Sequence, residues 1–139
     1  MDKKIDWEGF KSEIQGVRFE EGKEFVASRS KDYYWYSPIL DEIFKDKVGD
    51  LVVIPSNQEQ VKKVAAAIAK YRIPLTLRGG GTGNYGQCVP LEGGVIMIMT
   101  KLNRIVEFKE KSVLTESGVR ISRLDDAARD IGLELLMYP

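Results

Sequence analysis

The chain has 139 residues, which is enough for one domain, and its 43% hydrophobic content is sufficient for a buried core. Its 21 basic and 21 acidic residues balance, which argues against a nucleic-acid partner, because such proteins need a positively charged face. Histidine is absent and cysteine occurs once, so a histidine-dependent hydrolase, an ordinary zinc site and an internal disulfide are excluded within this chain.

The N-terminus is charged and lacks the apolar stretch of a signal peptide, and no apolar run approaches the roughly 20 residues that span a bilayer. We therefore expect a cytoplasmic protein without a transmembrane segment, in agreement with the lone cysteine. We also expect no metal site, because the commonest metal ligand is missing.

The first third of the chain predicts helices and irregular segments. Apolar residues at helical spacing predict a helix over 6–16, whereas 17–30 show no clear period. The aromatic segment 31–38 is interpreted as an irregular cover over the core, with a recognition surface as the alternative. Ser37 is a good N-cap for a short helix that follows it. We treat 1–47 as an N-terminal extension.

A β-α-β unit comes next. The continuous apolar run 51–54 predicts a strand buried on both faces, and Pro55 ends it. Ser56 or Asn57 can cap the long amphipathic helix that follows, in a capping-box arrangement. Residues 73–77 predict a second buried strand, so the two strands should be parallel and joined by a right-handed crossover.

Residues 78–87, the glycine loop, contain five of the 13 glycines in the chain. Glycine loses much conformational entropy on folding, so this cluster indicates positive φ angles or the close approach of a ligand. Consecutive amides in such a loop bind anions, and ligands bind at the carboxyl ends of strands in open α/β sheets. We interpret the loop as a phosphate-binding cradle, with a flexible surface loop as the alternative.

The glycine loop also contains the spacing G-x-G-x-x-G over 81–86, which occurs in nicotinamide-dinucleotide sites. Such a site requires a helix directly after the loop. Residues 87–94 instead carry proline and glycine and lead into another strand. We therefore disfavour a nicotinamide-binding domain, and the amides of the loop itself would have to bind the phosphate.

The rest of the chain predicts a strand, a two-stranded hairpin and an amphipathic helix, over residues 94–100, 105–108, 112–117 and 121–131. Ser122 is a candidate cap for that helix. The apolar run 133–138 would normally pair with a further segment. We expect either a fragment or completion by a second chain, and hence self-association through exposed apolar surface.

These segments resemble the first part of the FAD-binding domain of the vanillyl-alcohol oxidase, or p-cresol methylhydroxylase (PCMH), superfamily. Within it they are most similar to the glycolate oxidase and D-lactate dehydrogenase branch. The resemblance rests on the segments VIPS, IPLTLRGGGTG, GVIMIM, LNRI and ESGV, which start at Val53, Ile73, Gly94, Leu102 and Glu116. It implies an α+β fold with a β-α-β unit and a small mixed sheet. Residues 48–139 would form the first half of a PCMH-type FAD-binding domain, truncated at its C-terminal end.

In that family the backbone amides of the glycine loop wrap the FAD pyrophosphate, and the proline after the first strand lies near the adenine. The implied cofactor-binding residues are Pro55, Arg78, Gly79, Gly80, Gly81, Thr82, Gly83, Asn84 and Gln87, with Thr100 and Lys101 as weaker candidates on the rim. Some relatives attach FAD through a histidine at the position of Thr82, so the resemblance implies non-covalent FAD here.

The resemblance further implies a flavoprotein oxidoreductase that oxidises a small 2-hydroxy acid of the glycolate or D-lactate type by hydride transfer to flavin N5. A second FAD-binding segment and a cap domain, which carries the substrate and the catalytic base, are expected outside these residues. Catalytic residues are therefore unknown, and the chain alone is expected to be inactive and to retain FAD weakly. The alternatives are a non-redox module that binds a nucleotide or phosphate, and an assembly module that has lost FAD.

Overall fold

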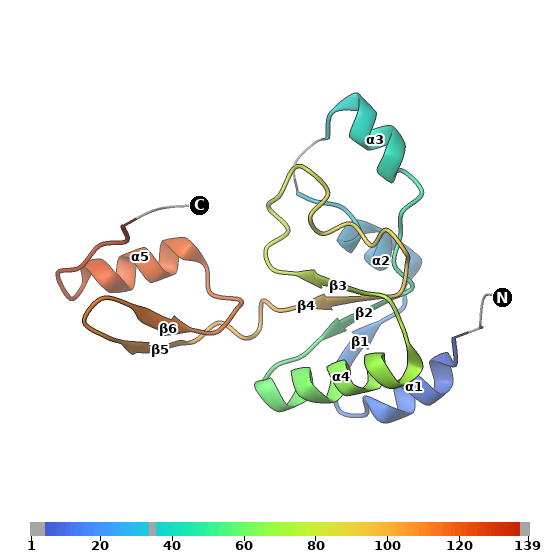
Figure 1. Cartoon of the computed structure of the whole chain (residues 1–139), viewed down its shortest axis with the longest axis horizontal. Helices are drawn as coiled ribbons and strands as arrows, with labels where there is room; N and C mark the ends of the chain where they lie inside the picture. The colour runs from blue at the N-terminus through green and yellow to red at the C-terminus, as the bar shows by residue number, and fades with distance from the viewer. Residues whose placement is uncertain (1–4, 34–35, 137–139) are drawn as a thin grey trace.

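The computed structural model describes residues 5–33 and 36–136. Two parts of the sequence predictions lie outside them: the aromatic pair at 34–35 and residues 137–139. In chain order the elements are α1 (Trp7–Glu13), β1 (Arg18–Glu20), α2 (Lys23–Arg29), α3 (Pro38–Phe44), β2 (Leu51–Ile54), α4 (Gln58–Tyr71), β3 (Leu75–Arg78), β4 (Val95–Ile98), β5 (Ile105–Phe108), β6 (Val113–Thr115) and α5 (Ile121–Arg129) (Figure 1).

A four-stranded sheet with the order β1-β2-β4-β3 forms the centre of the fold. β4 pairs in parallel with both β2 and β3, whereas β1 pairs antiparallel with β2. The predicted β-α-β unit is confirmed with one addition, because β4 is inserted between its two strands. The α+β class with a small mixed sheet is therefore confirmed.

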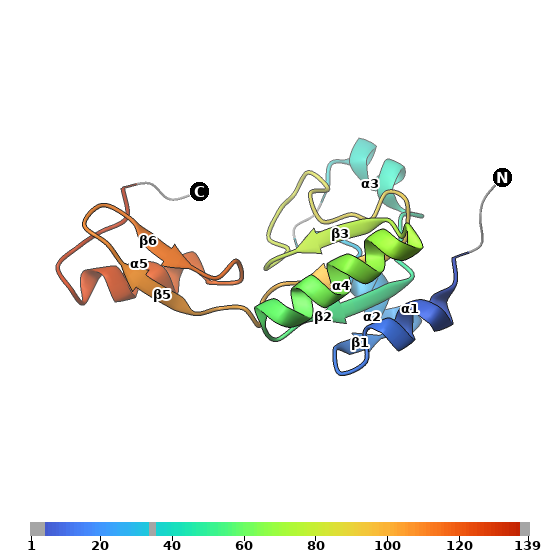
Figure 2. The ribbon, with the colours of Figure 1, turned by 60° about the horizontal axis from the view of Figure 1, so that its bottom comes forward.

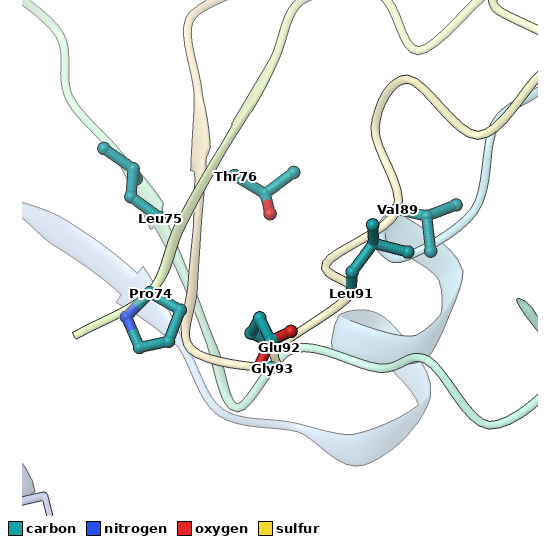
Figure 3. Close-up of a pocket in the computed structure, with 7 residues that line it drawn as sticks. All are labelled: Pro74, Leu75, Thr76, Val89, Leu91, Glu92 and Gly93. Carbon is teal, nitrogen blue, oxygen red and sulfur yellow. The ribbon is translucent and has the colours of Figure 1, made fainter.

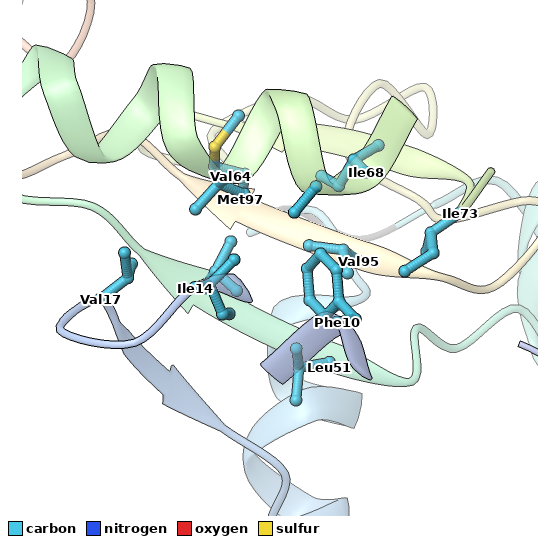
Figure 4. Packing of buried hydrophobic residues seen from close by; sticks show 11 residues of the cluster. Phe10, Ile14, Val17, Leu51, Val64, Ile68, Ile73, Val95 and Met97 are labelled. Atoms are coloured by element: carbon cyan, nitrogen blue, oxygen red, sulfur yellow. The ribbon is translucent and has the colours of Figure 1, made fainter. Parts of the chain in front are cut away.

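Both faces of β2 are buried, as the apolar run predicts. Leu51 and Val53 pack in a cluster with α1 and α4, and Val52 packs in a smaller cluster with α2. Figure 4 shows Phe10 of α1 in the larger cluster, where its ring meets that of Tyr71 edge-on with 6.3 Å between the centroids. Burying one such side chain stabilises the fold by about 1.5–3 kcal/mol, so the clusters fix the sheet beneath the glycine loop.

Two burial predictions are wrong. β3 is an edge strand rather than a buried one, and its residues Leu75 and Leu77 are 39% and 55% exposed. In α4 the helical spacing predicts an apolar face of Val61, Val64, Ala65, Ile68 and Tyr71. Ala65 is instead exposed, and Ala67 is buried. The face of α4 that meets the sheet is centred on Val64 and its neighbours one turn away, and Ala65 lies to the side of it.

The N-terminal residues contribute to the same sheet and core. Residues 17–30, which show no clear period, contain β1 and α2, and these elements are too short for a pattern to emerge. α1 packs on α4, and α2 packs on β2 (Figure 2). The predicted boundary after residue 47 falls in the connection before β2 and stays a prediction.

The predicted N-cap residues are confirmed for two helices, α3 and α4, and wrong for α5. The Ser37 hydroxyl accepts a hydrogen bond from the Leu40 amide at 3.3 Å, as expected for the cap of α3. Asn57 caps α4 by accepting from the Gln60 amide at 2.9 Å, and the Gln60 side chain accepts from the amide of Ser56. For α5 the prediction is wrong: Ser122 lies inside the helix, which begins without a side-chain cap.

The hairpin of β5 and β6, together with α5, forms a unit beside the main sheet (Figures 1 and 2). It buries Leu102, Leu124 and Ala128 but leaves Val106 and Leu114 more than half exposed. None of the helices in the part of the chain that the structure describes is long and apolar enough to cross a membrane.

Candidate cofactor site

Three parallel strands end at the same edge of the sheet, and the predicted site residues follow them. Pro55 follows β2 and is fully buried, and the glycine loop continues from β3 at Arg78. Thr100 and Lys101 come shortly after β4, which lies between the other two strands. The fold therefore brings the candidate residues together at the carboxyl edge, although they are up to 46 positions apart in sequence, from 55 to 101.

The Arg78 side chain is 6% exposed and is engaged within the protein. Its Nη1 donates to the backbone carbonyls of Lys31, at 2.6 Å, and Arg29, at 3.1 Å. The guanidinium thus ties the N-terminal segment to the base of the glycine loop. Its contribution to anion binding, which stays a prediction, would come from its charge and its backbone.

Backbone conformation or close neighbours disfavour a side chain at positions 81, 83 and 86. Gly81 has a φ of +69° and Gly86 a φ of +87°, a region that disfavours residues with a Cβ. A Cβ at Gly81 would overlap the Arg78 guanidinium, and one at Gly86 would overlap the ring of Phe44 in α3. At Gly83 a Cβ would overlap the side-chain oxygen of Gln87. Packing and backbone conformation explain these three glycines.

Gly79 and Gly80 have no such explanation. Both are exposed, and neither has a φ in the left-handed region. A Cβ at Gly79 would meet nothing within 4 Å, and one at Gly80 would make only an ordinary contact of 3.5 Å with Thr82. The space above these residues is open, and the folded chain itself does not require glycine there.

The amides of residues 79–84, which we call the amide cradle, donate no hydrogen bond to any other residue within the described ranges. The next amides along the loop are engaged: Tyr85 donates to the Gln87 side chain at 3.1 Å, and Gly86 and Cys88 donate to a carboxylate. Free backbone N–H groups on an exposed loop need water or a ligand as partners. Six consecutive donors, with open space beside Gly79 and Gly80, are suited to binding an anion.

Sequence reasoning missed the carboxylate that holds the far end of the loop. Asp32 is 8% exposed, and its two oxygens accept from the amides of Gly86, at 2.8 Å, and Cys88, at 3.1 Å. The Asp32 amide in turn donates to the Tyr36 hydroxyl at 2.7 Å. Gly86 and Cys88 lie more than 50 positions from Asp32. A lone aspartate in an aromatic segment carries no signal of such a contact.

Burial also perturbs the two titratable neighbours of Asp32. Burial raises the pKa of the Tyr36 hydroxyl; the hydrogen bond from the Asp32 amide lowers it, and the Asp32 charge raises it further. Burial likewise raises the pKa of the Cys88 thiol, whereas the positive charge of Arg78 lowers it and the negative charge of Asp32 raises it. Both groups therefore stay neutral near pH 7.

A shallow hollow of about 240 Å³ lies elsewhere, at the start of β3 (Figure 3). Its lining residues are Pro74, Leu75, Thr76, Val89, Leu91, Glu92 and Gly93. The hollow is at the opposite end of the strand from the amide cradle, and Glu92 is the only charged residue in its lining. Within the described residues, no cluster of carboxylates and cysteine could hold a metal ion.

Comparison with known proteins agrees with this geometry. Residues 49–139 match the model of a family described as FAD binding domain. A D-lactate dehydrogenase of Archaeoglobus fulgidus is 31% identical over 123 residues, which cover 88% of this chain and 24% of that protein. The glycolate oxidase subunit GlcD of Escherichia coli is 36% identical over 72 residues, covering 50% of this chain and 14% of that protein. The chain thus spans about a quarter or less of the length of these relatives.

Solved structures show the same fold. A 4-ethylphenol oxidase from Gulosibacter chungangensis superposes with a TM-score of 0.73 and 25% identity, over 97% of this chain and 27% of that one. An alkyldihydroxyacetonephosphate synthase gives a TM-score of 0.77 at 19% identity, over 99% of this chain and 30% of that one. The family match over 49–139, the relatives and the fold agree: the chain belongs to the FAD binding domain family, of the vanillyl-alcohol oxidase and PCMH type, whose cofactor is FAD.

Proposed function

We propose that the amide cradle, residues 79–84, binds the pyrophosphate of FAD. The observation that carries this proposal is the pair Gly79 and Gly80, which the fold does not require to be glycine. A residue without a side chain, next to open space and free amides, allows a ligand to approach the backbone closely. The pyrophosphate, with about two negative charges, matches several N–H donors at once.

The remaining predicted residues fit around this centre. Thr82, Asn84 and Gln87 are exposed and add polar side chains along the loop. Pro55 is buried at the end of β2, and we propose that the adenine lies near this end of the strand. Thr82 stands where a covalent link would need a nucleophile such as histidine, so we propose that FAD is bound non-covalently.

We further propose that the protein is an oxidoreductase acting on a small 2-hydroxy acid, because relatives are a D-lactate dehydrogenase and a glycolate oxidase subunit. When bound, FAD would supply the redox chemistry, as the acceptor at its N5 of a hydride from the substrate α-carbon. The residues of this chain hold and orient the cofactor. The groups that bind the hydroxy acid and accept its proton belong to the cap domain in our proposal. A cytoplasmic location also stays a prediction.

Titration of the ¹⁵N-labelled chain with FAD tests the cradle, because chemical shifts report even weak binding residue by residue. We expect the largest shifts at residues 79–84, with inorganic pyrophosphate shifting the same amides. Absence of shifts there would refute the cradle and favour a module that has lost FAD.

The activity is tested on the full-length polypeptide that contains this chain, with glycolate, D-lactate and L-lactate as substrates. We expect flavin absorbance and reduction of the flavin by glycolate or D-lactate. A full-length protein that is colourless and cannot be reconstituted with FAD would refute the oxidoreductase assignment.

A further inference from the structure

A carboxylate from the N-terminal segment already binds amides at the end of the glycine loop. The Asp32 carboxylate is nearly buried and accepts from the amides of Gly86 and Cys88, at 2.8 and 3.1 Å. Hydrogen bonds from backbone amides to an ionised carboxylate are stronger than those to a neutral acceptor. The last amides of the loop are therefore committed to an internal partner, whereas those of the amide cradle stay free.

The segment that carries Asp32 attaches to the loop on both sides of the free amides. Before them, Arg78 donates to the Lys31 carbonyl, and within them the Gly81 carbonyl accepts from the Tyr33 amide at 2.5 Å. After them, Asp32 holds Gly86 and Cys88. The stretch between these attachments is thus pinned at both ends, with its N–H groups left without partners among the described residues.

We propose that Asp32 is a positioning residue for FAD, which sets the conformation of the glycine loop so that the amide cradle is preformed. This inference rests on the proposed function of the loop. Preforming the loop lowers the entropy lost when the cofactor orders it. Asp32 would act through the amides of Gly86 and Cys88, without touching FAD.

Because Asp32 is negatively charged, a positioning role and a purely electrostatic role predict opposite changes in FAD affinity when it is neutralised. A carboxylate near a pyrophosphate repels it, so neutralising Asp32 would tighten FAD binding if its charge alone mattered. If Asp32 positions the loop, neutralising it weakens binding instead. The side-chain oxygen of asparagine can accept one of the two hydrogen bonds, but its NH₂ group faces the other amide as a second donor.

The experiment compares Asp32→Asn with the unchanged chain, using amide hydrogen exchange without ligand and ¹⁵N shift titrations with FAD. We expect faster exchange at Gly86 and Cys88, and FAD affinity lowered about ten-fold, the order expected from losing one charge-assisted hydrogen bond. Tyr36→Phe, which removes the acceptor of the Asp32 amide and keeps the carboxylate, should shift affinity in the same direction by less.

Asp50→Asn is the matched control. The Asp50 carboxylate also accepts a backbone amide, that of Gly94 at 2.7 Å, but at the amino end of the strands. We expect it to lower thermal stability and to leave FAD affinity unchanged, so loss of stability alone cannot mimic the effect.

Unchanged or tighter FAD binding in Asp32→Asn would overturn the inference, as would unchanged exchange at Gly86 and Cys88. If Asp32→Asn does not fold, Tyr36→Phe decides by the same two measurements. Failure of the proposed function has a different signature. In that case the unchanged chain itself shows no FAD-dependent shifts at the cradle, and the inference falls with it.

Discussion

The guanidinium of Arg78 lies in the space that a side chain at Gly81 would need. Gly81 also has a φ of +69°, a conformation that costs a residue with a Cβ roughly 1–2 kcal/mol. The sequence leaves two reasons open for the glycines of this loop, a positive φ or the close approach of a ligand. At Gly81 the structure shows the positive φ, and the neighbour that excludes a Cβ is a buried side chain of the protein itself.

Gly81→Ala should therefore destabilise the fold by at least about 1–2 kcal/mol, through backbone strain and displacement of Arg78 from its carbonyl acceptors. Urea unfolding followed by far-UV circular dichroism measures this effect. Gly80→Ala is the control, since a Cβ there makes only an ordinary contact, and it should change stability by less than about 0.5 kcal/mol. Equal stability of the two variants would contradict the packing described for Gly81.

Gly79→Ala should separate binding from stability. The fold has room for a Cβ at this position, so the free energy of unfolding should stay within about 0.5 kcal/mol of that of the unchanged chain. If FAD approaches the backbone here, the added methyl group should weaken FAD binding about ten-fold or more in the ¹⁵N titration. Unchanged affinity would remove the main support for the cradle, whatever the result at Gly81.

The sequence predicted the elements whose signals are local. The apolar run of β2, the long periodicity of α4 and the serine cap of α3 each depend on residues close together in the chain. The proline and glycines after Gln87 also excluded a helix, and the structure has none there. These predictions succeeded because hydrophobic period, cap and turn chemistry agree with the final fold.

The missed features depend on contacts between distant segments. No residue close to Asp32 in the sequence indicates that its carboxylate accepts hydrogen bonds from amides beyond position 85. Likewise, no residue close to Leu77 in the sequence indicates that β3 is an edge strand of the sheet. Strand order places β4 between β2 and β3, and this order is set by packing of the whole chain. Residues 31–38 are rich in aromatic side chains, and this pattern predicts packing of the segment but not the contact made by its one carboxylate.

The pairing of Glu116 with Arg104 predicts a specific pH dependence of stability. Hydrogen bonds from the Arg104 side chain, at 2.9 and 2.8 Å, hold the pKa of the Glu116 carboxyl below its usual range, and the Arg104 amide adds to this. A carboxyl with a lowered pKa in the folded state stabilises it above the unfolded pKa, about 4.3 for glutamate, and this contribution is lost as pH falls through the folded pKa.

Glu116→Gln should therefore lower the urea midpoint at pH 7 and have a smaller effect below pH 4. The comparison is made by urea unfolding at both pH values. Glu110→Gln, in the exposed turn between β5 and β6, is the control and should show little change at either pH. The same loss of stability for Glu116→Gln at both pH values would show that the ion pair does not cause the pH dependence.

Cys88 offers a chemical probe of the loop. Its thiol is partly buried, and burial raises its pKa, so less thiolate is present near pH 8 than in an unfolded chain. We expect slow reaction with Ellman's reagent in the folded chain and fast reaction in urea; since the chain has one cysteine, the signal is unambiguous. Because the folded pKa is raised, this thiol should also cost stability as pH rises above its unfolded pKa, about 8.5. A folded chain that reacts as fast as the unfolded one would contradict the burial of Cys88.

Exposed apolar side chains near α5 predict self-association. Ile131, Leu133 and Leu136 are 54%, 45% and 99% exposed, and Val106 and Leu114 of the hairpin are also more than half exposed. Exposed apolar residues that gather into a patch mark a contact site or promote association. Light scattering should show a mass that rises with concentration, and the double variant Ile131→Gln with Leu133→Gln should lower it.

Ile39→Gln is the matched control for this prediction. Ile39 is 74% exposed on α3, which lies away from the hairpin unit (Figure 1). If association used any exposed apolar residue, this variant would reduce it as well. We expect it to leave the concentration dependence unchanged, because the contact surface is built by the hairpin and α5. A monodisperse monomer for the unchanged chain would refute the prediction, and an equal effect of both substitutions would place the contact elsewhere.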